Sequence, residues 1–287
     1  MPWLFSLISA FCLATADALT KKHFSHLSSY EMGLIRLLAV VPWLLAAIFF
    51  VPWVKPDTVF FISLALALPL EVLAFLCYMR SIKVSPLSLS LPFLAFTPIF
   101  IILTGWLILG ESVTRPGLAG IVLIVSGAYC LNLSRISSGL LAPFKSILTE
   151  EGSRLMLLVA ALYSVTATLG KLSIVHSNPY TFGITYQLAF TVLIALCLPF
   201  MPRVSFKSLG HRPLMALLLG AVVFLSQLSH WIAISQTQAA YMIALKRTSI
   251  LFAVLYGAWL FKEEHVRARL VGATIMLGGV VCIAAFG

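Results

Sequence analysis

Residues 110–130, GESVTRPGLAGIVLIVSGAYC, return later in the chain as residues 262–282, KEEHVRARLVGATIMLGGVVC. The two stretches share an acid, an arginine, a leucine, two glycines and a cysteine at identical spacing, and both continue into a long apolar run. Another pair of similar stretches lies earlier in each half, at residues 19–33 and 169–183. The chain is therefore a duplicated module.

The composition places this module in a membrane. Of the 287 residues, 61% are hydrophobic and 10% are charged, and the mean hydropathy is +1.06. A water-soluble domain of this length could not bury so many apolar side chains. The five cysteines fall inside apolar runs without metal-ligand spacing, so we expect no disulfide, no metal and no cofactor. The net charge of +10 comes from bases between apolar runs, which indicates membrane topology rather than nucleic-acid binding.

Polar breaks divide the chain into segments close to the roughly 20 residues that a membrane-crossing helix needs. They predict an all-α polytopic membrane protein with ten transmembrane helices, at residues 2–20, 29–51, 58–80, 85–109, 115–133, 153–175, 179–200, 213–235, 238–261 and 266–286. Five spans per half is an odd number, so the second copy enters the bilayer upside down. Two inverted five-helix repeats, residues 1–134 and 153–287 with a linker at 135–152, are an architecture of secondary transporters.

The distribution of basic residues predicts an orientation. Thirteen lysines and arginines lie in or beside loops on the side opposite the termini, against three on the termini side, Lys55, Arg115 and Lys171. Because cytoplasmic loops carry the excess of basic residues, we expect both termini outside the cytoplasm and the chain in the plasma (inner) membrane.

The repeated stretch resembles a known family. A glutamate, a short polar turn, an arginine and a glycine-rich span, as at Glu111, Arg115 and Gly120 and again at Glu263, Arg267 and Gly272, are similar to the end of an EamA-type repeat of the drug/metabolite transporter superfamily. The resemblance covers nearly the whole chain. It implies a ten-helix carrier, usually an exporter of small metabolites such as amino acids, driven by gradients rather than ATP. Many members of this family have cytoplasmic termini, whereas the charge distribution here predicts the reverse.

A structural role explains the repeated residues themselves. Glu111 and Arg115 are four residues apart at a helix beginning, where the acid favours the helix dipole and an ion pair can form. Gly120, Gly127 and their counterparts Gly272 and Gly279 would let neighbouring helices approach closely.

Ionisable residues deep in a span are the sharper signal for a site, because burying each costs about 2.5 to 3.5 kcal/mol near the bilayer centre. Glu71 and Arg36 lie roughly 13 Å and 10 Å from the same end of their helices at 1.5 Å per residue. They predict either a structural Glu71–Arg36 ion pair or a substrate or proton site. Asp17, one turn before Lys21, is interpreted as part of an interfacial ion pair.

The second half provides basic residues at a comparable depth. Lys246 and Arg247 are adjacent and point about 100° apart on one continuous helix, so a single site could not easily use both. Lys246 shares its helical stripe with small and polar residues and is the better cavity residue, with an anion or carboxylate as its expected contact. Arg247 is expected to pack against a neighbouring helix and to hydrogen-bond to its carbonyl groups or to an acid.

Further polar and aromatic residues complete the predicted site. Gln227 and His230 are three residues apart and face together, and His230 is either a substrate contact or a structural hydrogen-bond partner. The weaker candidates are Gln187, Tyr78, Trp231, Tyr256 and Arg247.

These residues favour a secondary active transporter that moves a small polar or zwitterionic, amino-acid-like metabolite by alternating access, with export as the expected direction. The alternatives are an uptake carrier and a proton-coupled antiporter for a small cation or anion. A lipid-modifying membrane enzyme is disfavoured, because no H-E-x-x-H, G-x-S-x-G, phosphate loop or paired-acid motif is present. The expected partners are a small-molecule substrate and the lipid bilayer, with protons as a coupling ion through Glu71, no nucleic acid, and a monomeric chain.

Overall fold

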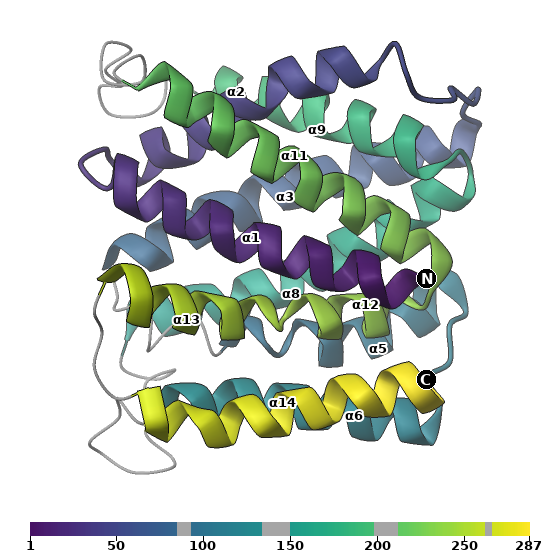
Figure 1. The fold of residues 1–287 in the computed structure, drawn as a ribbon. Coiled ribbons are helices and arrows are strands. Elements are labelled where there is room, and N and C mark those ends of the chain that lie inside the picture. The colour runs from purple at the N-terminus through teal and green to yellow at the C-terminus, as the bar shows by residue number, and fades with distance from the viewer. Residues whose placement is uncertain (85–92, 134–149, 198–211, 262–265) are drawn as a thin grey trace.

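The computed structural model describes residues 1–84, 93–133, 150–197, 212–261 and 266–287, and these residues form helices and turns without a β-strand. The helices in chain order are α1 (Pro2–Phe24), α2 (Ser29–Ala47), α3 (Thr58–Val84), α5 (Thr97–Leu109), α6 (Arg115–Leu133), α8 (Glu151–Val175), α9 (Pro179–Leu196), α11 (Pro213–Gln236), α12 (Ala239–Lys246), α13 (Ser249–Phe261) and α14 (Val266–Phe286) (Figure 1). The all-α class is confirmed. Most of the predicted linker, together with Glu263, lies outside the described residues.

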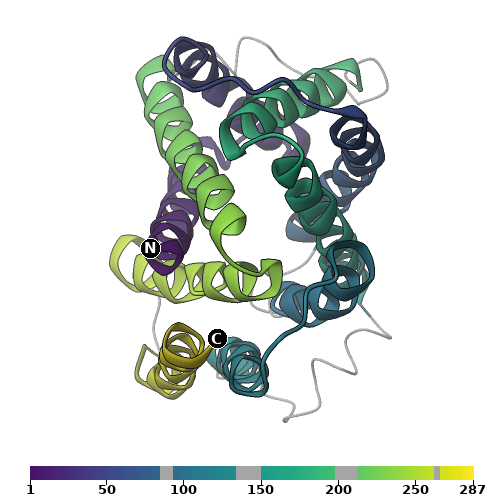
Figure 2. The same ribbon diagram turned by 90° about the vertical axis from the view of Figure 1, so that its right-hand side faces the viewer.

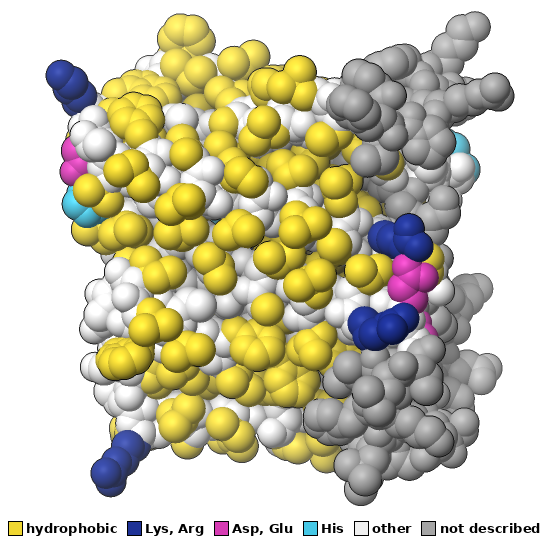
Figure 3. All heavy atoms as spheres, turned by 180° about the vertical axis from the view of Figure 1, so that it is seen from behind, with side chains coloured by type: hydrophobic (Ala, Val, Ile, Leu, Met, Phe, Trp, Pro, Cys, Tyr) yellow, Lys and Arg dark blue, Asp and Glu magenta, His cyan; other side chains and the backbone are white. Residues whose placement is uncertain are grey.

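Six of these helices are long and apolar enough to cross a membrane: α1, α2, α3, α8, α9 and α11. Large apolar side chains on them point outward, for example Phe61, Leu66 and Leu73 on α3. The rear view shows hydrophobic side chains over the whole middle of the molecule, with charged side chains gathered toward its two ends (Figure 3). This distribution is that of a multi-pass membrane protein, because lipid contacts the middle and water the ends.

The predicted span 238–261 is wrong as a single helix. The chain forms α12 and α13, separated by a turn at Arg247 and Thr248. The Thr248 hydroxyl donates to the Leu245 carbonyl at 2.7 Å, and such a side-chain bond competes with regular helical pairing. The break places Lys246 at the end of α12 and Arg247 at the first residue of the turn.

Contacts at the helix ends fix the helix directions. Arg80 near the end of α3 pairs with Glu151 at the beginning of α8 at 2.6 Å, while Asp57 before α3 meets His176 after α8 at 2.6 Å. Helices α3 and α8 therefore run antiparallel. Likewise Arg212, before α11, donates to His23 near the end of α1 at 2.9 Å if the histidine nitrogen carries no proton, so α1 and α11 are antiparallel as well.

The two halves interleave rather than lie side by side. Helix α1 of the first half packs on α11 of the second, and α8 of the second packs on α3 of the first. The view from the termini end shows these helices, with α2, α9, α12 and α13, arranged around a central region, while α6 and α14 form an outer pair (Figure 2). Both termini lie at the same end of the molecule (Figure 1).

The α6–α14 pair confirms the expected role of the repeated glycines. A Cβ atom at Gly279 would lie 2.6 Å from the Gly120 carbonyl oxygen, and one at Gly127 would lie 2.6 Å from the Gly272 carbonyl oxygen. Since two backbones block the space, only glycine permits this close packing.

Gly279→Ala is therefore expected to destabilise the protein by about 1 to 3 kcal/mol, because the methyl group forces α6 and α14 apart. Its matched control is the adjacent Gly278→Ala, where a Cβ meets nothing within 4 Å. Melting temperatures of the purified variants in detergent measure the difference. Equal melting temperatures would contradict the packing argument.

Candidate functional site

A cavity of about 300 Å³ lies between the interleaved halves. Its walls come from α1, α2, α3, α5, α8, α9, α11, α12 and α13. Nine of the ten residues predicted from the sequence line it: Arg36, Glu71, Tyr78, Gln187, Gln227, His230, Trp231, Lys246 and Arg247. The volume is at the lower end of the roughly 300–1,000 Å³ found for small-molecule sites.

The basic side of the cavity is built at the break between α12 and α13. Lys246 ends α12, and its Nζ lies 3.3 Å from His230 Nδ1. Arg247 follows in the turn and is only 8% exposed, with its Nη2 donating to Thr97 Oγ1 at 2.9 Å. Arg247 contacts a neighbouring helix as expected, but through the Thr97 hydroxyl rather than through a carbonyl group or an acid. The expectation that one site could not easily use both bases is wrong, because Lys246 and Arg247 line the same cavity.

The acidic side is provided by Glu71 on α3. Its carboxylate interacts with the hydroxyl groups of Thr166 on α8 and Tyr186 on α9. It also interacts electrostatically with Lys246. Hydroxyl donors are the partners that a carboxylate needs where water is scarce. An acid and a base from different halves therefore line one cavity.

The expected Glu71–Arg36 ion pair is wrong. Arg36 donates through Nη1 to Asp17 Oδ1 at 2.5 Å, and Asp17 also lines the cavity. The interpretation of Asp17 as an interfacial residue is therefore wrong too. A usable signal was present, since Asp17 lies seven residues before the end of α1 and Arg36 seven after the start of α2, about 10 Å from the same end at 1.5 Å per residue.

Aromatic and amide side chains form the remaining wall. Phe75 meets Phe190 edge to face at 5.5 Å between ring centroids, and Phe182 lies 5.1 Å from Tyr186. Gln227 donates through Nε2 to Gln187 Oε1 at 3.3 Å, while Gln187 Nε2 is buried without a partner among the described residues. A ligand here would meet both apolar rings and free hydrogen-bonding groups.

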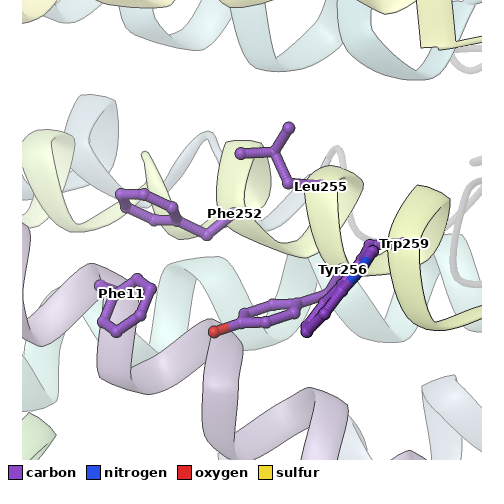
Figure 4. A pocket seen from close by; sticks show the side chains of 5 residues that line it. All are labelled: Phe11, Phe252, Leu255, Tyr256 and Trp259. Atoms are coloured by element: carbon purple, nitrogen blue, oxygen red, sulfur yellow. The ribbon is translucent and has the colours of Figure 1, made fainter.

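Tyr256 is the predicted site residue that lies elsewhere. It belongs to a separate pocket between α1 and α13 with Phe11, Phe252, Leu255 and Trp259 (Figure 4). Its hydroxyl forms a 2.7 Å hydrogen bond with Thr15. Leu255 and Trp259 are strongly exposed on the hydrophobic surface, so this pocket faces the surroundings of the bundle rather than its interior.

A second ionic group closes the cavity at the termini end, and sequence reasoning missed it. Lys171 on α8, also a lining residue, donates to Glu111 and, at 2.6 Å, to the Thr237 carbonyl. The other Glu111 oxygen accepts from the Ala239 N–H at 2.9 Å, at the beginning of α12. The predicted Glu111–Arg115 pair is therefore wrong. The observed Glu111–Lys171 pair connects α8, the loop before α6 and the start of α12.

Asp57 strengthens the same end from outside the membrane-spanning part. The backbone N–H of Phe60, and secondarily the His176 ring, hold the pKa of Asp57 below its usual range. The carboxylate thus stays charged at neutral pH and caps α3 by accepting from the Phe60 N–H at 3.0 Å.

Comparisons with known proteins agree with this architecture. The sequence model of the EamA-like transporter family matches residues 1–133 and 151–285. A protein of Archaeoglobus fulgidus described as an uncharacterized transporter is 24% identical over 294 residues, covering 96% of this chain and 94% of the relative. A crystal structure with 15% sequence identity superposes with a TM-score of 0.75 over 98% of this chain and 96% of the other, a likeness of fold alone.

Proposed function

Because this chain belongs to the EamA-like transporter family, we propose that it is a secondary active transporter for a small polar or zwitterionic metabolite. The observation that carries the proposal is one cavity lined by Glu71 from the first half and by Lys246 and Arg247 from the second half. Charged groups inside a membrane are costly and are kept where they serve a pathway. Groups of both signs in one small space suit a cargo that carries a charge or two opposite charges.

Alternating access is the proposed mechanism, by rocking of one inverted five-helix repeat against the other. The antiparallel pairs α3 with α8 and α1 with α11 support this mechanism. In each pair, a helix of the first half packs against a helix of the second half that runs in the opposite direction. The repeated sequence, the position of both termini at one end and the close α6–α14 pair are further support. A site between two oppositely oriented halves can open to either side by such a motion.

Export across the plasma membrane, with both termini outside the cytoplasm, remains the proposed direction and orientation. The excess of basic residues opposite the termini supports the orientation. Uptake, or exchange of a small ion for protons, is the alternative that the same cavity would serve, and a monomer is the proposed working unit, since each chain brings its own cavity.

Solute counterflow tests the carrier function. Proteoliposomes loaded with a mixture of unlabelled amino acids and small carboxylic acids are expected to take up labelled members of that mixture several-fold faster than unloaded proteoliposomes, without ATP. A carrier exchanges solutes because its binding site, with a solute bound, can turn from one side of the membrane to the other. An uptake rate that does not depend on the internal solutes, or that requires ATP, would contradict the proposal.

A further inference from the structure

The acids of this chain are almost all engaged. Of nine Asp and Glu residues, seven lie in the part of the chain that the structure describes. Asp17 pairs with Arg36, Asp57 with His176, Glu111 with Lys171 and Glu151 with Arg80. Glu31 and Glu150 cap α2 and α8. Glu71 is left as the acid of the described residues that faces the cavity and forms no ion pair there.

The two cavity bases at the α12–α13 break have no acid of their own among the described residues. The hydrogen-bond partner of Lys246 in this part of the chain is His230, which offers no negative charge. Arg247 is 8% exposed and donates to the uncharged Thr97, and its Nε is buried without a partner among the described residues. Glu71 lines the same cavity and can balance one of the two bases, which leaves the other base without an acid among the described residues.

We infer that the cargo carries a carboxylate, which binds between Lys246 and Arg247 and gives the bound cargo a net negative charge. The inference rests on the proposed carrier function and narrows its cargo to organic monocarboxylates. One carboxylate cancels the excess charge and fills the free Nε–H of Arg247, whose planar fork suits a two-oxygen acceptor. A doubly charged phosphate would overshoot the balance, and an organic cation would add to the excess.

The rest of the cavity fits the non-ionic part of such a cargo. Phe75, Phe182 and Phe190 line the same space, so an apolar carbon skeleton would be buried against rings. The unpartnered Gln187 Nε2 offers one hydrogen bond to a polar substituent. Since the two bases come from the α12–α13 break and the rings from α3 and α9, different helices can hold the carboxylate and the skeleton at the same time.

Binding without transport tests the inference. The full-length protein in detergent is melted in the presence of sodium acetate, 4-methylpentanoate, benzoate and inorganic phosphate, with leucine and 3-methylbutylamine as the zwitterionic and cationic relatives of 4-methylpentanoate. At matched ionic strength, at least one monocarboxylate is expected to raise the melting temperature by about 5 °C or more at saturation. The amine and phosphate are expected to give no rise.

Arg247→Gln and Lys246→Gln should each lose this rise, and Arg247→Lys should keep part of it. Arg80→Gln is the matched control, because Arg80 is 65% exposed at the helix end and should leave the rise intact. If one of the two glutamine variants does not fold, the other decides. A rise that persists without the bases, an equal rise with the amine, or no rise with any carboxylate would overturn the inference. Counterflow that continues in any of these cases would leave the carrier function standing, so the two failures are distinguishable.

Discussion

Glu71→Gln is expected to reduce transport in proteoliposomes about 10- to 100-fold and to remove its dependence on an imposed pH gradient. The carboxylate interacts with Thr166, Tyr186 and the charge of Lys246, and a charged hydrogen bond lost in such a place costs about 1.5 to 3 kcal/mol. Glutamine keeps the shape but can neither carry the charge nor take up a proton. If Glu71 binds protons during the cycle, Glu71→Gln should make the transport rate insensitive to pH, whereas substitution of an acid outside the cavity should not.

The control for this experiment is Glu151→Gln. Glu151 pairs with Arg80 at the exposed end of α8, away from the cavity, so its loss should leave transport and pH dependence nearly unchanged. Both variants must show the melting temperature of the unmodified protein. Unchanged uptake with unchanged pH dependence in Glu71→Gln would remove Glu71 from the mechanism.

Lys171→Met is expected to destabilise the protein by about 3 to 5 kcal/mol, the typical cost of leaving one partner of a buried ion pair alone. The Lys171 and Glu111 side chains are only 11% and 16% exposed, and Lys171 also bonds the Thr237 carbonyl. Without the lysine, the Glu111 carboxylate would lose its ion-pair partner in a place with little water. The melting temperature and the midpoint of denaturant unfolding measure the loss.

Arg115→Met is the matched control, because Arg115 is the partner that sequence spacing predicted for Glu111 and is exposed in the structure. Adding Glu111→Gln to Lys171→Met should recover part of the stability, since the double variant holds no unpaired charge. A Lys171→Met variant as stable as Arg115→Met would show that the ion pair contributes nothing.

The sequence could place residues by depth but not by direction. Nine of the ten predicted site residues line the cavity, because distance from a helix end follows directly from the residue number. Tyr256 does not line the cavity, because a residue at a suitable depth can still face outward. The same limit explains the wrong Glu71–Arg36 and Glu111–Arg115 pairs. Arg36 and Glu111 pair with residues of other helices, and no local sequence pattern specifies how those helices are rotated about their axes.

The sequence alone determined that this protein is an all-helical membrane protein built from a duplicated module, where most of its helices lie and how deep Glu71, Arg36, Lys246 and Arg247 lie. Those properties follow from hydrophobicity and spacing along the chain, which are local. The tertiary structure alone decided that Arg36 pairs with Asp17, that Glu111 bonds both Lys171 and the start of α12, and that Lys246 and Arg247 line one cavity. Such contacts join residues up to 128 positions apart, and only the packing of helices against one another brings them together.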